Sequence, residues 1–135
     1  GVPIEYEIDE SERLVRTRCR GSFSVENLIQ HSIRVNGDPR FSPGMNTLID
    51  FTEAELNDDV EAVSRYVQHS RELADFRGAC RWACVVSDES EADLIWTFNL
   101  VVQSRGIPIK TRAFYDEEEA LRWLGEASVS APKKD

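Results

Sequence analysis

The stretch Asn46-Thr47-Leu48-Ile49-Asp50-Phe51-Thr52 is a short run with an apolar centre, between a Pro- and Gly-rich segment at 38–44 and an acidic segment at 53–57. A short run with such a centre is typical of a buried strand in a sheet. Amphipathic helical patterns lie on both sides of it. The stretch therefore predicts the central strand of an α/β sheet.

Two strands with alternating apolar and charged residues are predicted before this run, at 4–9 and 15–20. One register places every apolar side chain of the pair on the same face, with the pairs Ile4–Cys19, Tyr6–Thr17 and Ile8–Val15. The same register sets Glu7 opposite Arg16 and Glu5 opposite Arg18. We therefore predict an antiparallel hairpin whose arginines form ion pairs across the strands. An anion-binding stripe of arginines is the alternative.

Helical and strand patterns alternate after the hairpin. Ser24 and Gly37 are expected to bound the first helix, whose buried stripe is predicted to be Val25, Leu28, Ile29, Ser32 and Ile33. Further helices are predicted at 58–75, at 89–105 and after Asp116, and further strands at 80–86 and 107–115. The order ββαβαβαβα predicts a mixed, mostly parallel sheet with helices packed on it. One domain is expected over residues 1–127, with a flexible polar tail at 128–135.

The composition limits the classes of partner. The chain has 135 residues, and 16 Lys and Arg against 25 Asp and Glu give a formal net charge of -9 at pH 7. This charge opposes binding to nucleic acid or to an anionic membrane surface. No apolar run approaches the ~18 residues of a membrane span, and the first residues lack a signal-peptide pattern. We expect a cytoplasmic protein with no nucleic-acid partner and no membrane span.

The cysteines and histidines do not form a recognisable metal or redox motif. Cys19, Cys80 and Cys84 lie in predicted strands, where they are expected to act as small apolar side chains. A reactive thiol or a partial metal site is the alternative for Cys80 and Cys84. His31 and His69 lie in predicted helices, and surface positions are expected for both. No metal, cofactor or glycine-rich phosphate loop is predicted.

The pattern of strands and loops resembles the small bacterial SpoIIAA-like proteins, which share the STAS and CRAL-TRIO type of α/β fold. The resemblance covers essentially the whole chain, and it is carried by Ile4-Glu5-Tyr6-Glu7-Ile8-Asp9, Leu14-Val15-Arg16-Thr17, the loop 38–44, Leu48-Ile49-Asp50-Phe51 and Glu119-Ala120-Leu121-Arg122-Trp123-Leu124. STAS antagonists of anti-sigma factors carry a phosphorylated serine after the central strand. The matching place here, Asn57-Asp58-Asp59-Val60, has no Ser or Thr. Asp58 and Asp59 either replace that switch with fixed charge or simply cap a helix.

The carboxyl ends of the parallel strands are where a ligand or switch is expected in such a sheet. The candidate residues at this edge are Asp50, Thr52, Asn57, Asp58, Ser87 and Asp88. Ser87 is not in a nucleophile-elbow context, and neither histidine belongs to a recognisable triad. No catalytic residue is therefore assigned.

The helix expected at 89–105 carries two apolar arcs. Its predicted core face is Leu94, Ile95, Phe98, Val101 and Val102, while Trp96 and Leu100 fall on the other side. Trp96 and Leu100 are expected either to contact a partner or to be covered within the monomer, and both readings stay open.

These observations favour a non-enzymatic interaction or regulatory module that binds another protein or forms a homodimer. The alternative is a binder of a small apolar ligand or lipid, because CRAL-TRIO proteins hold a lipid in a cavity. Those proteins use additional helices that this short chain does not match in full. A hydrolase is the third reading, and it requires two titratable groups within hydrogen-bond reach in a cleft.

Overall fold

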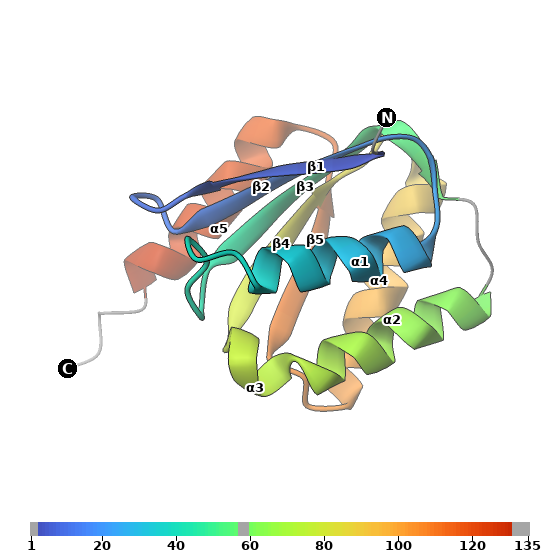
Figure 1. The fold of residues 1–135 in the computed structure, drawn as a ribbon. Helices are drawn as coiled ribbons and strands as arrows, with labels where there is room; N and C mark the ends of the chain where they lie inside the picture. The colour runs from blue at the N-terminus through green and yellow to red at the C-terminus, as the bar shows by residue number, and fades with distance from the viewer. Residues whose placement is uncertain (1–2, 57–59, 131–135) are drawn as a thin grey trace.

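The computed structural model describes residues 3–56 and 60–130, with Val60 and residues 127–130 described by their backbone only (Figure 1). The elements are β1 (Ile4–Asp9), β2 (Leu14–Phe23), α1 (Val25–Asn36), β3 (Asn46–Leu56), α2 (Val60–Glu72), α3 (Ala74–Arg77), β4 (Cys80–Val85), α4 (Glu89–Ser104), β5 (Ile109–Phe114) and α5 (Glu117–Ser130). The predicted order is confirmed. The helix expected at 58–75 ends at Glu72, and the short α3 follows it as a separate helix.

The five strands form one sheet in the order β1-β2-β3-β4-β5, so β3 is the middle strand, as predicted. β1 and β2 are antiparallel, and the other neighbours are parallel. Helix α5 covers one face, where Trp123 and Leu124 pack in a cluster with Leu48 and Val85. Helices α1, α2 and α4 lie on the opposite face (Figure 1). The sheet is therefore the middle of three layers.

The hairpin has the predicted register in full, from Ile4 opposite Cys19 to Ile8 opposite Val15. The expected ion pairs across the hairpin differ, because the arginines pair mostly with other elements. The observed pairs are Arg16–Glu117 at 3.4 Å, Arg18–Asp50 at 3.6 Å and Arg20–Glu53 at 3.5 Å, with Glu5 at 4.0 Å from Arg20. Asp50 is directly opposite Arg18 in the parallel neighbour β3, which explains that choice of partner.

Strand β3 is longer than predicted. The segment expected to be a loop after Thr52 continues as a strand to Leu56, because it pairs with Arg20 to Phe23 of β2, which also extends past its predicted end. The register shifts between Arg18 and Arg20, so β3 carries one extra residue there. This bulge changes which side chains of β3 face α1 and α2.

Helix α1 begins as predicted, with Ser24 as N-cap and a reciprocal capping box with Asn27. Its buried stripe differs from the prediction, since Ile33 is exposed while His31 and Val35 are buried. The expected surface position of His31 is therefore wrong. Its Nε2 lies 3.0 Å from the hydroxyl of Thr17, which supplies the polar partner that a buried imidazole needs.

Two features of the C-terminal half also differ from the prediction. Helix α5 continues to Ser130, so the predicted start of the tail at residue 128 falls inside a helix. In α4, Leu94 was expected in the core, but 38% of it is exposed. The predicted N-cap of α4 is confirmed, because Asp88 accepts a hydrogen bond from the backbone of Glu91.

Candidate functional site

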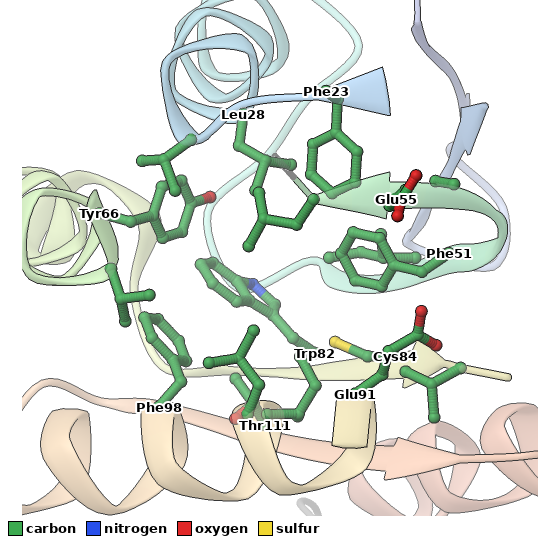
Figure 2. A pocket seen from close by; sticks show the side chains of 18 of the residues that line it. Phe23, Leu28, Phe51, Glu55, Tyr66, Trp82, Cys84, Glu91, Phe98 and Thr111 are labelled. Carbon is green, nitrogen blue, oxygen red and sulfur yellow. The ribbon is translucent and has the colours of Figure 1, made fainter. Parts of the chain in front are cut away.

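A cavity of about 400 Å³ lies between the sheet and helices α1, α2 and α4 (Figure 2). The sheet contributes Ile49 and Phe51 from β3, Trp82 and Cys84 from β4, and Thr111 from β5. The helices contribute Leu28 of α1, Val63 and Tyr66 of α2, and Leu94, Ile95 and Phe98 of α4. Phe23 at the end of β2 also lines it, so its walls are mostly apolar and come from seven different elements.

The bulge in β3 shapes one wall of this cavity. Without it, strict alternation would turn Ala54 and Leu56 away from the side that Ile49 and Phe51 face. With one extra residue in the strand, all four side chains line the cavity. Bulges commonly redirect side chains next to binding sites. The irregularity that the sequence did not predict therefore creates part of the pocket.

Aromatic rings hold the inner end of the cavity in a fixed arrangement. The rings of Trp82 and Phe98 are stacked, with centroids 6.1 Å apart, and Tyr66 is tilted against both at 6.2 and 5.9 Å. A second pair, Phe23 and Phe51, stacks at 5.7 Å. Rings packed in this way form a rigid, largely apolar surface.

Acidic side chains line the opposite end, where Figure 2 shows Glu55 and Glu91. Asp88, at the start of α4, also lines the cavity. The carboxylates of Asp88 and Glu91 already accept backbone hydrogen bonds, from Glu91 N at 2.9 Å and from Ser87 N at 2.7 Å. None of the described residues that line the cavity is Lys, Arg or His.

Two polar atoms in the cavity wall have no hydrogen-bond partner among the described residues. They are the indole Nε1 of Trp82 and the hydroxyl of Thr111, which belong to residues 6% and 4% exposed. The side chain of Trp82 interacts with the thiol of Cys80, but sulfur is only a weak acceptor. Unsatisfied buried polar groups are rare in proteins and call for an explanation.

The titratable groups of the wall are not set up for nucleophilic chemistry. Burial raises the pKa of the Cys84 thiol to about 12, and it also raises the pKa of Tyr66 to about 12. Both groups therefore stay protonated near neutral pH. The reading of Cys84 as a small apolar side chain agrees with its burial.

The residues predicted from strand ends do not form a single site. Asp50 and Thr52 lie on β3. Asp50 faces away from the cavity, where its carboxylate pairs with Arg18 and accepts hydrogen bonds from the hydroxyl and the backbone N–H of Thr52. Ser87 donates a hydrogen bond to the Thr52 carbonyl at 3.2 Å. Among the described members of the predicted group, only Asp88 lines the cavity.

Two further members of that predicted group lie outside the described residues. These are Asn57 and Asp58, and with them the question of a fixed-charge switch at Asp58 and Asp59. On α4, Trp96 is 65% exposed and Leu100 is 48% exposed, so the described part of the chain covers each only in part.

The sequence indicated an apolar pocket only as an alternative and did not assign the residues that line it. Trp82 and Thr111 lie directly opposite each other in neighbouring strands. The sequence predicted only that each lies in a strand. A usable signal was present in Glu53-Ala54-Glu55-Leu56, whose alternation of acidic and apolar residues indicates continued strand with one face inward.

Within the described part of the chain, no group of three or more His, Cys, Asp or Glu could hold a metal ion. Over the same residues, no helix combines the length and apolar character that crossing a bilayer requires.

Comparison with known proteins identifies the fold class. No protein-family model matches the chain, and no curated protein matches it in sequence. A similar solved structure is the crystal structure of an uncharacterised protein of the DUF3478 family with a SpoIIAA-like fold from Shewanella loihica PV-4. The two chains are 19% identical with a TM-score of 0.64, and the match covers 90% of this chain and 93% of that one. The protein therefore has a SpoIIAA-like fold, as the sequence predicted.

Proposed function

We propose that this protein is a non-enzymatic module that binds a small apolar ligand in the cavity between the sheet and helices α1, α2 and α4. The observation that carries the proposal is the cavity. Its volume of about 400 Å³ falls among small-molecule sites, which span roughly 300–1,000 Å³. Its mostly apolar wall with a few polar groups matches the usual composition of such sites.

The polar groups of the cavity support binding over catalysis. A hydrolase would need a nucleophile or a paired acid and base within reach of a bound substrate. The thiol of Cys84 is held protonated by burial. The carboxylates of Asp88 and Glu91 are engaged with backbone N–H groups at the start of α4. These groups therefore serve the structure of the wall.

The proposal is tested by titrating the protein with Nile red, an uncharged dye whose emission rises and shifts to the blue in apolar surroundings. We expect saturable binding of one dye per chain. An Ala54→Trp variant places an indole where Ala54 lines the cavity, and it should lose this signal.

A matched control separates the cavity from the exposed apolar surface of α4. Trp96→Asp removes the most exposed large apolar side chain in the described part of the chain, and Trp96 does not line the cavity. It should bind the dye as wild type does. If Ala54→Trp keeps the signal and Trp96→Asp loses it, the dye binds α4 and the proposal is wrong.

Self-association is a second candidate function. The observation that favours it is the exposure of Trp96 and Leu100, one turn apart on α4, at 65% and 48%. A second copy of the chain that packs the same helix against itself would remove both from water. Light scattering tests this: the wild type should be a dimer and Trp96→Asp a monomer. A monomeric wild type, or a dimeric variant, contradicts it.

A further inference from the structure

A groove of about 620 Å³ runs along the amino ends of strands β2 to β5, and it shares no lining residue with the cavity. Its lining includes Arg13, immediately before β2, Arg81 at the second position of β4, and Lys110 at the second position of β5. None of its described lining residues is Asp or Glu. Three cations therefore line one groove in a chain whose acidic residues outnumber the basic ones by 25 to 16.

The sheet register brings two of these cations to the same face. Arg81 and Lys110 are directly opposite each other in the parallel pairing of β4 and β5. Their side chains therefore leave neighbouring strands on the same side. Like charges in opposite positions of a sheet repel each other and cost stability. An anion in the groove would offset that repulsion.

The guanidinium of Arg13 lies at the groove and keeps donors to spare. A Cβ atom added at Gly44, which also lines the groove, would lie 3.2 Å from Arg13 Nη2. This nitrogen donates to the carbonyl of Pro43 at 2.7 Å, and no other side-chain hydrogen bond of Arg13 is present among the described residues. Because a guanidinium has five N–H donors, most of them are available to a ligand.

The other two cations differ in their partners. Arg81 donates to the carbonyl of Trp123 at 2.8 Å and has the carboxylate of Glu126 at 3.9 Å. Lys110 is exposed, and it has no hydrogen-bond or ion-pair partner in the described part of the chain. Arg81 therefore anchors α5 and contributes its charge, whereas Lys110 has its ammonium donors free for a ligand.

We infer that this groove binds a small anion with several negative charges, such as the diphosphate group of a small molecule, through Arg13 and Lys110. Arginine presents a planar fork that matches phosphate oxygens, and lysine adds a point charge. A small anion fits within the groove, whereas an extended polyanion such as a nucleic acid would also meet the repulsion of the net charge of -9. The inference does not depend on a ligand in the cavity.

Isothermal titration of the full chain with sodium pyrophosphate at low ionic strength, where exposed charges are least screened, tests the inference. We expect one saturable site. Lys110→Gln and Arg13→Gln should each weaken pyrophosphate binding roughly three- to tenfold, because each removes a charged donor. Arg112→Gln is the matched control: it removes the same charge from the same strand, but Arg112 does not line the groove. It should weaken binding by less than about twofold.

Two outcomes would overturn the inference. One is the absence of saturable pyrophosphate binding by the wild type. The other is equal weakening by Lys110→Gln and Arg112→Gln, which would mean that binding follows the overall charge of the chain. Lys110 is exposed, so Lys110→Gln should keep the wild-type urea midpoint, and this variant decides the matter if Arg13→Gln does not fold. Lys110→Gln should also bind Nile red as wild type does, because Lys110 does not line the cavity.

Discussion

The guanidinium carbon of Arg77 lies 5.2 Å from the centre of the Trp82 ring, and it lies at the same distance from the centre of the Phe41 ring. Arg77 is only 5% exposed, and no ion pair to an Asp or Glu is present for it among the described residues. Its charge is held instead by two aromatic faces and by the side-chain oxygens of Asn36 and Thr47. Because Trp82 lines the cavity, Arg77 also fixes one wall of the candidate site.

This arrangement predicts that Arg77→Lys destabilises the protein more than Arg77→Met. Lysine keeps the buried charge but loses the flat group that stacks on both rings, which should cost about 1–2 kcal/mol of unfolding free energy. Methionine fills a similar space and removes the buried charge. Because Arg77 has no ion-pair partner among the described residues, its removal leaves no carboxylate without a counter-charge. Urea denaturation of both variants measures the difference. A more stable Arg77→Lys would show that charge, rather than stacking, is what the site requires.

The two buried threonines Thr111 and Thr47 should respond in opposite ways to loss of the hydroxyl. Thr111 has a hydroxyl with no partner, so Thr111→Val should leave the unliganded protein unchanged or stabilise it by up to about 1 kcal/mol. The hydroxyl of Thr47 accepts from Arg77 Nη2 at 3.3 Å. Thr47→Val should therefore cost about 1–3 kcal/mol, because it leaves a buried charged donor unsatisfied.

Thermal unfolding of the two Thr→Val variants provides a matched comparison, since both residues are in the sheet and both are about equally buried. A clear loss of stability in Thr111→Val would mean that its hydroxyl has a stabilising partner in the folded protein.

The burial of the His31 imidazole predicts that the protein loses stability in mild acid. Burial, and then the nearby Arg34 and Arg77, lower its pKa to about 4 from the usual 6.5. The unfolded chain therefore takes up this proton first as pH falls. The contribution of neutral His31 to the free energy of unfolding is fully present above about pH 6.5 and is lost progressively as the pH falls from 6.5 to 4. It amounts at most to on the order of 3 kcal/mol. Urea midpoints at pH 7 and pH 4.5 measure it.

A His31→Gln variant should show a smaller fall in the urea midpoint between these two pH values. His69→Gln is the comparison, because burial also lowers the pKa of His69, which is less buried than His31. It should change the pH dependence less than His31→Gln does. An unaltered fall in His31→Gln would assign the acid sensitivity to other groups.

Much of the fold could be predicted because local patterns agreed with one another. In the hairpin, the apolar alternation of Ile4, Tyr6 and Ile8 and the opposite charges of Glu5 and Arg18 selected a single register, and that register is observed. Predicting which charges would form ion pairs failed. An arginine side chain can reach several carboxylates, and the choice depends on strands that are distant in sequence.

The site was harder to predict, since its walls come from seven elements and depend on a bulge. Glu53 to Leu56 has weak strand propensity, and its pairing with the end of β2 decides its structure. The unpartnered state of Thr111 cannot be read from sequence at all. Threonine in a buried strand usually finds an acceptor, and only the packing around it shows that this one does not.

The buried cysteines predict slow thiol chemistry in the folded protein. Burial raises the pKa of Cys19 and of Cys84 to about 12 each. At pH 8 the thiolate fraction of both residues should be much smaller in the folded protein than in the protein unfolded by urea. Reaction with an aromatic disulfide should therefore be on the order of a thousandfold slower in the folded state. In a Cys80→Ser background, which removes the least buried of the three thiols, the native protein should therefore show no fast phase.

The same labelling experiment distinguishes the two readings of Cys84. As a small apolar wall residue, Cys84 should react only when the chain opens, and a ligand in the cavity should slow the reaction further because Cys84 lines it. As a reactive thiol, it would be modified quickly in the folded state. Fast labelling of Cys84 at pH 8, with the protein still folded, would contradict the burial argument and would reopen a covalent role for the cavity.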